Sequence, residues 1–293
     1  MLGVLGVPFC KGSITQGRCD LAPYAIRSIL GKFTTFDVTQ GYNLEELEVK
    51  ELGDLDIANS LPGDAAEVVT SSVGSALQSV DALVILGGDN SVTRPAFRGL
   101  DQPITECALL TLDAHLDLRD LAGGQTNGNP IRGLLEDGLP GHNIVQIGIQ
   151  SFVNSEPYME VARSAGIRVI DVEQVRARGI DSVVRESLAD LALVARRIYV
   201  DFDIDVLDRA FAPACPGSRP GGLLPYELLR AARCCGTNPK VLAVDIVEVD
   251  PDKDIAENTV MAAASCLLAF AAGLQARIVN PPASDPSPIC PQL

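Results

Sequence analysis

The chain has 293 residues, of which 47% are hydrophobic and 21% charged, and this composition is typical of a folded protein with a large core. Its formal net charge of −15 argues against nucleic acids and anionic membranes as partners, because an acidic surface repels phosphate groups. The same acidity either attracts cations or only keeps the protein in solution.

The first residues predict a buried strand rather than an export signal. Residues 1–13 read MLGVLGVPFCKGS and lack the basic opening of a signal peptide. We also expect no stretch long and apolar enough to span a bilayer. The eight cysteines include no CxxC pair with zinc spacing, so free thiols are favoured over disulfides in a chain of this length. The expected location is therefore the cytoplasm.

Short β-rich apolar runs alternate with helical stretches along the whole chain. This alternation predicts an α/β fold with a mostly parallel sheet that helices cover on both faces. No break in composition divides the chain, so we expect one domain over residues 1–293, with the proline-rich residues 280–293 as a tail. In chain order, the expected elements are a strand at Leu2–Val7, a further strand near Thr34–Val38, a helix at Ala65–Leu77, strands at Ala82–Leu86, Ala108–Leu112 and Ile144–Ile149, a helix at Ser151–Ser164, a strand at Arg168–Ile170, a helix at Ser182–Ala195, a strand at Ile198–Phe202, a helix at Pro225–Cys234, a strand at Val241–Ile246 and a helix at Thr259–Ala272.

Four of the expected strands end in unusually polar residues. In chain order these ends read GGDNS (87–91), DAHLD (113–117), DFDID (201–205) and DIVE (245–248). Open parallel sheets bind their ligands beyond the carboxyl ends of the strands. The polar ends therefore mark the edge of the sheet at which a site is expected.

Two of these ends carry alternating acidic residues. A spacing of two on an extended chain puts Asp113, His115 and Asp117 on one face, and Asp203 and Asp205 on one face of another strand. Without compensation these carboxylates would repel one another and resist burial, and a divalent cation removes that conflict. The alternatives are a polar loop with a chance pattern and a solvated acidic turn. Because two independent clusters lie at the same predicted edge, a metal site is favoured, and four aspartates suit two ions.

Taken together, the ordered motifs resemble those of the ureohydrolases, which are the arginases, agmatinases, guanidinobutyrases and formiminoglutamases. The similarity rests on GGDNS, DAHLD, DFDIDVLDRAFAP with a following PGG, and DIVEVDP, together with an opening GVP and G-x-x-x-x-AP-x-x-IR at 17–27. The resemblance covers nearly the whole chain. It implies a three-layer α/β/α domain with a mostly parallel eight-stranded sheet, two manganese ions at its carboxyl edge and assembly into trimers or hexamers. It also implies hydrolysis of a guanidino carbon–nitrogen bond, which releases urea from a compound similar to agmatine or arginine.

The resemblance also implies roles for single residues. Asp113 and Asp203 would bridge the two metals, His115 and Asp205 would complete the shell of one, and Asp117 would ligate the other. A physical account adds two further roles. Asp117 would accept the proton of the attacking water and pass it to the leaving amine. Glu248 would pair with the guanidinium or with the developing tetrahedral centre, and the alternative is a charge that faces solvent.

Three segments depart from the family pattern. Asn90 stands where the family has a histidine that ligates the same metal as Asp117, and an amide oxygen is a weaker donor than imidazole. This substitution predicts a weakened metal site. Asn127 stands where the family often has a histidine that is proposed to shuttle protons, and asparagine does not titrate. Residues 214–219, ACPGSR, replace a loop rich in Gly-Thr-Gly, and Arg219 there is either a ligand for a substrate carboxylate or a solvated loop residue.

Three functional hypotheses follow from the sequence. The first is an active, metal-dependent amidinohydrolase that acts on a small guanidino or amidino compound. The second is a hydrolase of the same fold with a different substrate or a single working metal. The third is a non-catalytic subunit or binding protein that has kept the fold, which the loss of both histidines would suit.

Overall fold

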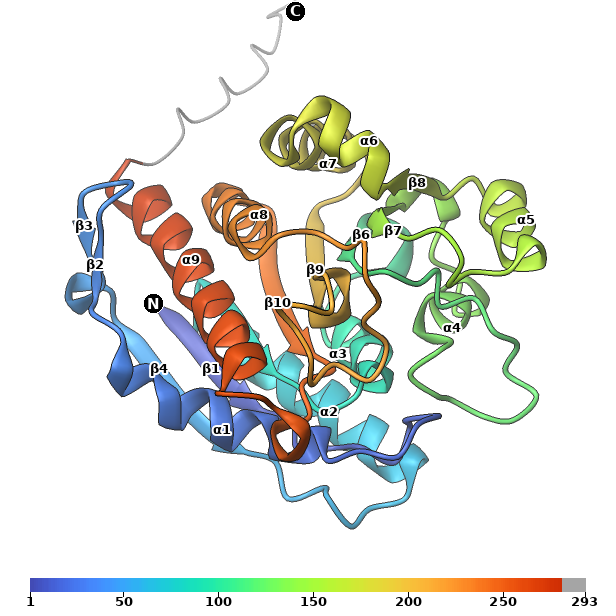
Figure 1. The fold of residues 1–293 in the computed structure, drawn as a ribbon, viewed down its shortest axis with the longest axis horizontal. Coiled ribbons are helices and arrows are strands. Elements are labelled where there is room, and N and C mark those ends of the chain that lie inside the picture. The colour runs from blue at the N-terminus through green and yellow to red at the C-terminus, as the bar shows by residue number, and fades with distance from the viewer. Residues whose placement is uncertain (281–293) are drawn as a thin grey trace, which may run out of the picture.

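The structure is a computed structural model that describes residues 1–280, and an eight-stranded parallel sheet forms its centre (Figure 1). Every neighbouring pair of strands in this sheet runs parallel. The predicted tail lies outside the described residues except for Asn280. In spatial order, the strands are β4 (Val49–Asp54), β1 (Leu2–Gly6), β5 (Ala82–Leu86), β10 (Val241–Val247), β9 (Arg197–Asp203), β6 (Cys107–Leu112), β7 (Ile144–Ile149) and β8 (Arg168–Asp171).

Helices cover both faces of this sheet, because nearly all central strand residues are apolar on both sides. In β5 the side chains of Ala82, Val84 and Leu86 pack into one core, while those of Leu83 and Ile85 pack into another. The first core is closed by α1 (Ala22–Ile29), α6 (Val172–Arg178), α7 (Ile180–Val194), α8 (Pro225–Thr237) and α9 (Asn258–Val279). The second is closed by α2 (Pro62–Leu77), α3 (Thr93–Arg98), α4 (Pro130–Glu136) and α5 (Glu156–Ala165). The predicted three-layer α/β/α architecture is confirmed.

Several elements differ from the sequence prediction. The edge strand β4 was not predicted, because its sequence VKELGD is charged and mostly exposed and so lacks an apolar run. The strand expected near Thr34–Val38 is only β2 (Phe36–Asp37), which pairs antiparallel with β3 (Tyr42–Asn43) outside the main sheet. The helix expected from Ser151 begins at Glu156, behind a turn. The helices α1, α3, α4 and α6 were not predicted, because each is too short for the spacing of its apolar residues to indicate a helix.

The C-terminal helix α9 is a core helix, although its composition resembles that of a membrane span. It has 22 residues and is long and apolar enough to cross a bilayer, which corrects the expectation that no such stretch exists. In the structure, 78% of its most apolar window is buried. Its closest helical neighbour is α8, which it approaches through Gly273 and Gly236. A Cβ added to Gly273 would lie 2.1 Å from the carbonyl oxygen of Arg233.

This close approach makes Gly273 a stability determinant. We expect Gly273→Ala to lower the free energy of unfolding by about 1–3 kcal/mol, because the backbone of α8 cannot yield as a side chain would. Thermal unfolding measures the change. Gly63→Ala in α2 is the matched control, since a Cβ there meets nothing within 4 Å, and it should leave stability unchanged or raise it through helix propensity. Equal stability of the two variants would show that α8 and α9 move apart without cost.

Candidate metal centre

The four polar strand ends predicted from the sequence meet at one place. They follow β5, β10, β9 and β6, which are four consecutive strands in the middle of the sheet. Parallel strands present their carboxyl ends at the same edge, so residues separated by more than 150 positions come into contact there. The backbone N–H of Asn90, for example, donates to Glu248 Oε1 at 2.8 Å.

Asp113, His115 and Asp205 form the tightest group at this edge. Their ligand atoms all lie within 4.8 Å of one another. The His115 Nδ1 atom is 2.8 Å from Asp205 Oδ2 and 3.5 Å from Asp113 Oδ1. The second carboxylate oxygen of Asp113 is buried and has no hydrogen-bond partner among residues 1–280. Two carboxylates and an imidazole lie close together, and one carboxylate oxygen lacks a partner, which suits the binding of a divalent cation.

Asp203 joins the same group through the start of a short 3-10 helix. It ends β9, and its Oδ1 accepts a hydrogen bond from the backbone N–H of Asp205 at 2.9 Å, which caps the turn Ile204–Val206. The Asp205 Oδ1 atom in turn accepts from the backbone N–H of Ala114 at 3.1 Å. These bonds fix one oxygen of each carboxylate and tie β9 to the segment that follows β6.

Asn90 and Asp117 form a second pair beside this group. Asn90 Nδ2 donates to Asp117 Oδ2 at 2.8 Å, and Thr93 Oγ1 lies 2.6 Å from Asn90 Oδ1. Thr93 Oγ1 also lies 2.7 Å from Asp245 Oδ2. The single hydroxyl proton of Thr93 cannot serve both acceptors at once. If the Asn90 amide turns over, Nδ2 donates to Thr93, Thr93 donates to Asp245, and the carbonyl oxygen of Asn90 faces Asp117.

Asn127 contacts Glu248 and not the aspartate cluster. Its Nδ2 donates to Glu248 Oε1 at 3.0 Å, and its Oδ1 accepts from the backbone N–H of Ile14 at 3.0 Å. Both bonds hold the amide in one orientation. Glu248 therefore accepts two hydrogen bonds on the same oxygen, from Asn127 and from the backbone of Asn90.

Two of the site residues have backbone conformations that L-amino acids rarely adopt. Asp117 has φ +52° and Glu248 has φ +63°, both in the left-handed region. Both residues carry a side chain, so this conformation costs free energy that a glycine would not incur. Such strain persists only where the surrounding structure imposes it, and it is concentrated at functional sites. It aims these two carboxylates at the same cavity.

Burial and mutual repulsion dominate the electrostatics. Burial and the charge of Asp205 raise the pKa of Asp113 to about 7, and burial raises the pKa values of Asp117 and Asp203 well above the ordinary value, with the charge of a neighbouring aspartate adding to it. Burial and the charge of Asp89 raise the pKa of Glu248 to about 8.

His115 partly compensates this repulsion. The charge of Asp205 raises the pKa of His115 to about 12. In return, burial acts to raise the pKa of Asp205, but the charge of His115 and the hydrogen bonds that Asp205 receives from His115 and the backbone of Ala114 together lower that pKa. One imidazolium cannot compensate five buried carboxyl groups, so the centre favours either protons or cations.

A cavity of about 380 Å³ opens over this centre. Its floor includes His115, Asp117, Asp203, Asp205 and Glu248, and its outer wall adds the side chains of Ile14, Thr15, Arg119, Asn127, Phe152, Val153, Pro216 and Arg219. This volume suits a small metabolite.

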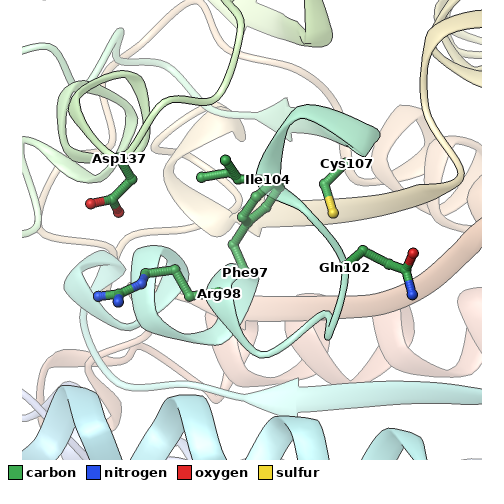
Figure 2. Close-up of a pocket in the computed structure, with 6 residues that line it drawn as sticks. All are labelled: Phe97, Arg98, Gln102, Ile104, Cys107 and Asp137. Carbon is green, nitrogen blue, oxygen red and sulfur yellow. The ribbon is translucent and has the colours of Figure 1, made fainter.

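A second hollow of about 220 Å³ lies at the opposite edge, where β6 begins (Figure 2). Its lining combines apolar side chains with single polar ones, among them Arg98 and Asp137. The one carboxylate there is engaged by Arg94 at 2.7 Å. The convergence of carboxylates distinguishes the first cavity from the second.

Sequence reasoning missed parts of this site. A buried network behind the centre joins Tyr199, whose hydroxyl donates to Asp245 Oδ2 at 2.8 Å, with Thr93 on the same oxygen. Only the position of Asp245 at a strand end pointed to it. Arg119 lines the cavity, and the available signal was its place two residues after Asp117, which continues the spacing of Asp113, His115 and Asp117.

Comparisons with known proteins agree with this geometry. The model of the arginase family matches residues 1–273. The chain is 37% identical over 276 residues to a formimidoylglutamase of Halalkalibacterium halodurans, an alignment that covers 92% of this chain and 86% of that protein. It is 31% identical over 224 residues to an agmatinase of the same bacterium, with 75% and 74% covered. The solved structure of formimidoylglutamase from Bacillus subtilis is similar with a TM-score of 0.89 at 32% identity, covering 94% of this chain and 87% of that one.

The raised pKa values predict how the metal-free protein responds to pH. The carboxyl groups of Asp113 and Glu248, whose pKa values are raised to about 7 and about 8, stabilise the fold when they are protonated. That contribution is complete below their ordinary values of 3.8 and 4.5 and is lost as the pH rises through 7 and 8. The contribution of His115 is complete below 6.5 and also declines above it, toward its raised value of about 12.

We therefore expect the protein in EDTA to be less stable at about pH 8.5 than at about pH 6, by at least about 1 kcal/mol. Mn²⁺ should remove the difference, because cations replace the lost protons. Calorimetric melting with EDTA or Mn²⁺ at both pH values measures this, and Asp113→Asn should flatten the EDTA profile. Stability that rises with pH in EDTA would contradict the electrostatic account.

Proposed function

Because the chain belongs to the arginase family, we propose that it hydrolyses an amidino carbon–nitrogen bond with the help of two divalent cations. The observation that carries the proposal is the convergence of buried carboxylates with one imidazole, including an unsatisfied oxygen of Asp113. Hard oxygen donors favour manganese or magnesium, and manganese is proposed here because the resemblance of the motifs implies it.

We propose that two groups of residues hold the ions. Asp113 and Asp203 would be shared, His115 and Asp205 would complete one shell, and Asn90 and Asp117 would serve the other. The 2.8 Å contact between Asn90 and Asp117 supports this pairing, since ligand atoms of one ion lie about that far apart. Asn90 would ligate through its carbonyl oxygen after the amide turns over. The hydroxyl of Thr93, which has two competing acceptors in the present orientation, supports that turn.

The chemistry needs a strong nucleophile and a proton for the leaving amine. When two divalent ions are bound, they lower the pKa of water so that hydroxide is available near neutral pH. Asp117 lines the floor of the cavity and would take up the proton of the water and pass it to the departing nitrogen. Glu248 would pair with the cationic amidine. Asn127 does not titrate, and we propose that it orients Glu248 through the 3.0 Å hydrogen bond.

Formimidoylglutamate is our proposed substrate. The sequence alone favoured a compound similar to agmatine or arginine. The relative with 37% identity over 92% of the chain is a formimidoylglutamase, whereas the agmatinase is 31% identical over 75% of it. Attack of water at the formimidoyl carbon and cleavage of its bond to the amino nitrogen would give formamide and glutamate.

We also propose that the enzyme works in the cytoplasm as a homo-oligomer. The free state of all seven cysteines in the described part of the chain suits a reducing compartment. The oligomer, a trimer or hexamer, rests on the resemblance of the motifs alone.

A substrate panel tests the activity. With Mn²⁺ we expect turnover of formimidoylglutamate, measured as formamide and glutamate, and little urea from arginine, agmatine or guanidinobutyrate. Asp113→Asn and Asp203→Asn should each lower kcat/KM by more than about a hundredfold, because even indirect partners of a metal contribute that much. Asp137→Asn, which removes an ion pair with Arg94 far from the centre, is the matched control. Full activity after removal of all metal would overturn the proposal.

The two asparagines give a separate test. Asn90→His should tighten manganese binding at its site, since imidazole is a better donor than an amide. Asn127→His should leave metal affinity unchanged, because residue 127 faces Glu248 and not the aspartates. Manganese titration by calorimetry distinguishes the two variants. If turnover of any amidine appears only when both histidines are present, the natural chain is a non-catalytic relative.

A further inference from the structure

The outer wall of the cavity carries two arginines, Arg119 and Arg219, which oppose the anionic floor. Within residues 1–280, neither guanidinium makes an ion pair with a carboxylate. Arg27, Arg94 and Arg233 each engage an aspartate, whereas the two arginines of the cavity wall have no such partner in the described part of the chain. Two cationic groups that the protein does not neutralise point to an anionic ligand.

Arg119 is held in place by its neighbours. Its backbone N–H donates to the carbonyl oxygen of Gly128 at 3.1 Å. Its side chain lies directly over Gly128, where an added Cβ would be 2.6 Å from Arg119 Cδ and 2.8 Å from Nε. The absence of a side chain at position 128 therefore makes room for the arginine. Gly128 follows Asn127, so Arg119 is positioned by the same loop that holds Glu248.

Arg219 is held by a loop that lies against the proposed metal ligands. Its Nη1 donates to the carbonyl oxygens of Gly217 at 3.1 Å and Ser218 at 2.9 Å. A Cβ on Gly217 would be 2.0 Å from Asp205 Oδ2, so the loop touches the centre itself. The Ser218 side chain is buried, and its hydroxyl oxygen lies within hydrogen-bond distance of two carbonyl oxygens, that of Ala212 at 2.8 Å and that of Cys215 at 3.0 Å, which holds the loop from behind. The remaining guanidinium N–H groups of Arg219 are available to a ligand.

The cavity is thus sorted by charge, with carboxylates at the floor and guanidinium groups at the wall. A substrate with a cationic amidine at one end and carboxylates at the other matches both parts. The ammonium tail of agmatine would instead meet two like charges, and such contacts oppose binding. Guanidinium groups recognise carboxylates with two parallel hydrogen bonds, which gives orientation as well as affinity.

We propose that Arg119 and Arg219 bind the carboxylates of the substrate and restrict the enzyme to amidino derivatives of acidic amino acids. This inference rests on the proposed function of the metal centre and adds the residues that determine specificity. Arg219, which the sequence left open between a carboxylate ligand and a solvated loop residue, is assigned the first role. Arg119 is a new member of the site.

The test compares formimidoylglutamate with two analogues in which one carboxylate is replaced by a neutral amide. We expect the wild type to prefer the diacid by at least about tenfold in kcat/KM over each analogue. Arg119→Gln and Arg219→Gln should each abolish the preference against one analogue while changing turnover of that analogue by no more than about twofold. If an arginine had only a structural role, its replacement would lower kcat/KM for all three substrates together. Arg98→Gln, at an exposed arginine in the opposite hollow, is the matched control and should keep the wild-type preferences.

A binding measurement separates this inference from the proposed function. Calorimetric titration of the Mn²⁺-loaded protein with L-glutamate needs no turnover, and each Gln variant should weaken binding at least about tenfold, with Arg119→Lys and Arg219→Lys in between. If no amidine is hydrolysed but glutamate binding depends on both arginines, the proposed activity fails and this inference stands. If formimidoylglutamate is hydrolysed while both Gln variants keep the wild-type preferences, or if glutamate does not bind at all, the inference is wrong.

Discussion

The need to hold several carboxylates close together and away from water governs this structure. Asp113, Asp203, Asp205 and Glu248 are each at most 3% exposed, and only one imidazole lies among them. Desolvation of even one ionised carboxylate costs several kcal/mol, so the group is tolerable only with protons or cations between its members. A parallel sheet provides the scaffold, because its central strands are covered on both faces and deliver their carboxyl ends to one edge. The apolar strands β5, β6, β9 and β10 position the polar residues that follow them.

The backbone around the centre reflects the same constraint. Asp117 and Glu248 adopt left-handed conformations, and Gly217 approaches Asp205 more closely than any side chain would allow. Backbone N–H groups of Ala114, Asn90 and Asp205 each donate to a site carboxylate. These bonds fix one oxygen of a carboxylate while its other atoms face the neighbouring acidic groups. The backbone therefore organises the centre, and its strain is supported by the rigid sheet beneath it.

The sequence predicted the inner part of this arrangement because local pattern and topology agreed there. Apolar runs ended at alternating acidic residues, and the edge rule for parallel sheets brought them together. The same reasoning failed where a signal was not local. β4 is a charged edge strand without an apolar run, and α9 was not recognised as long enough to resemble a membrane span. The contact of Asn127 with Glu248 joins loops that are 121 positions apart, and only a folded chain reveals it. Arg119 had the spacing of a site residue, but its unpaired charge is a property of the tertiary structure.

These limits follow from how the site is divided. The floor is built on strand ends that the hydrophobic core holds in place, so the position of its carboxylates follows from the sheet itself. The wall is built on loops, 119–128 and 215–219, and the arginines that they carry lie outside the hydrophobic core. Asn90, which stands where the motif of the family has a histidine, alters one donor at the floor without removing a carboxylate. Two arginines on the wall, by contrast, place positive charge opposite the carboxylates of the floor. In the function proposed above, the reaction thus depends on the sheet edge, and the choice of substrate depends on the loops above it.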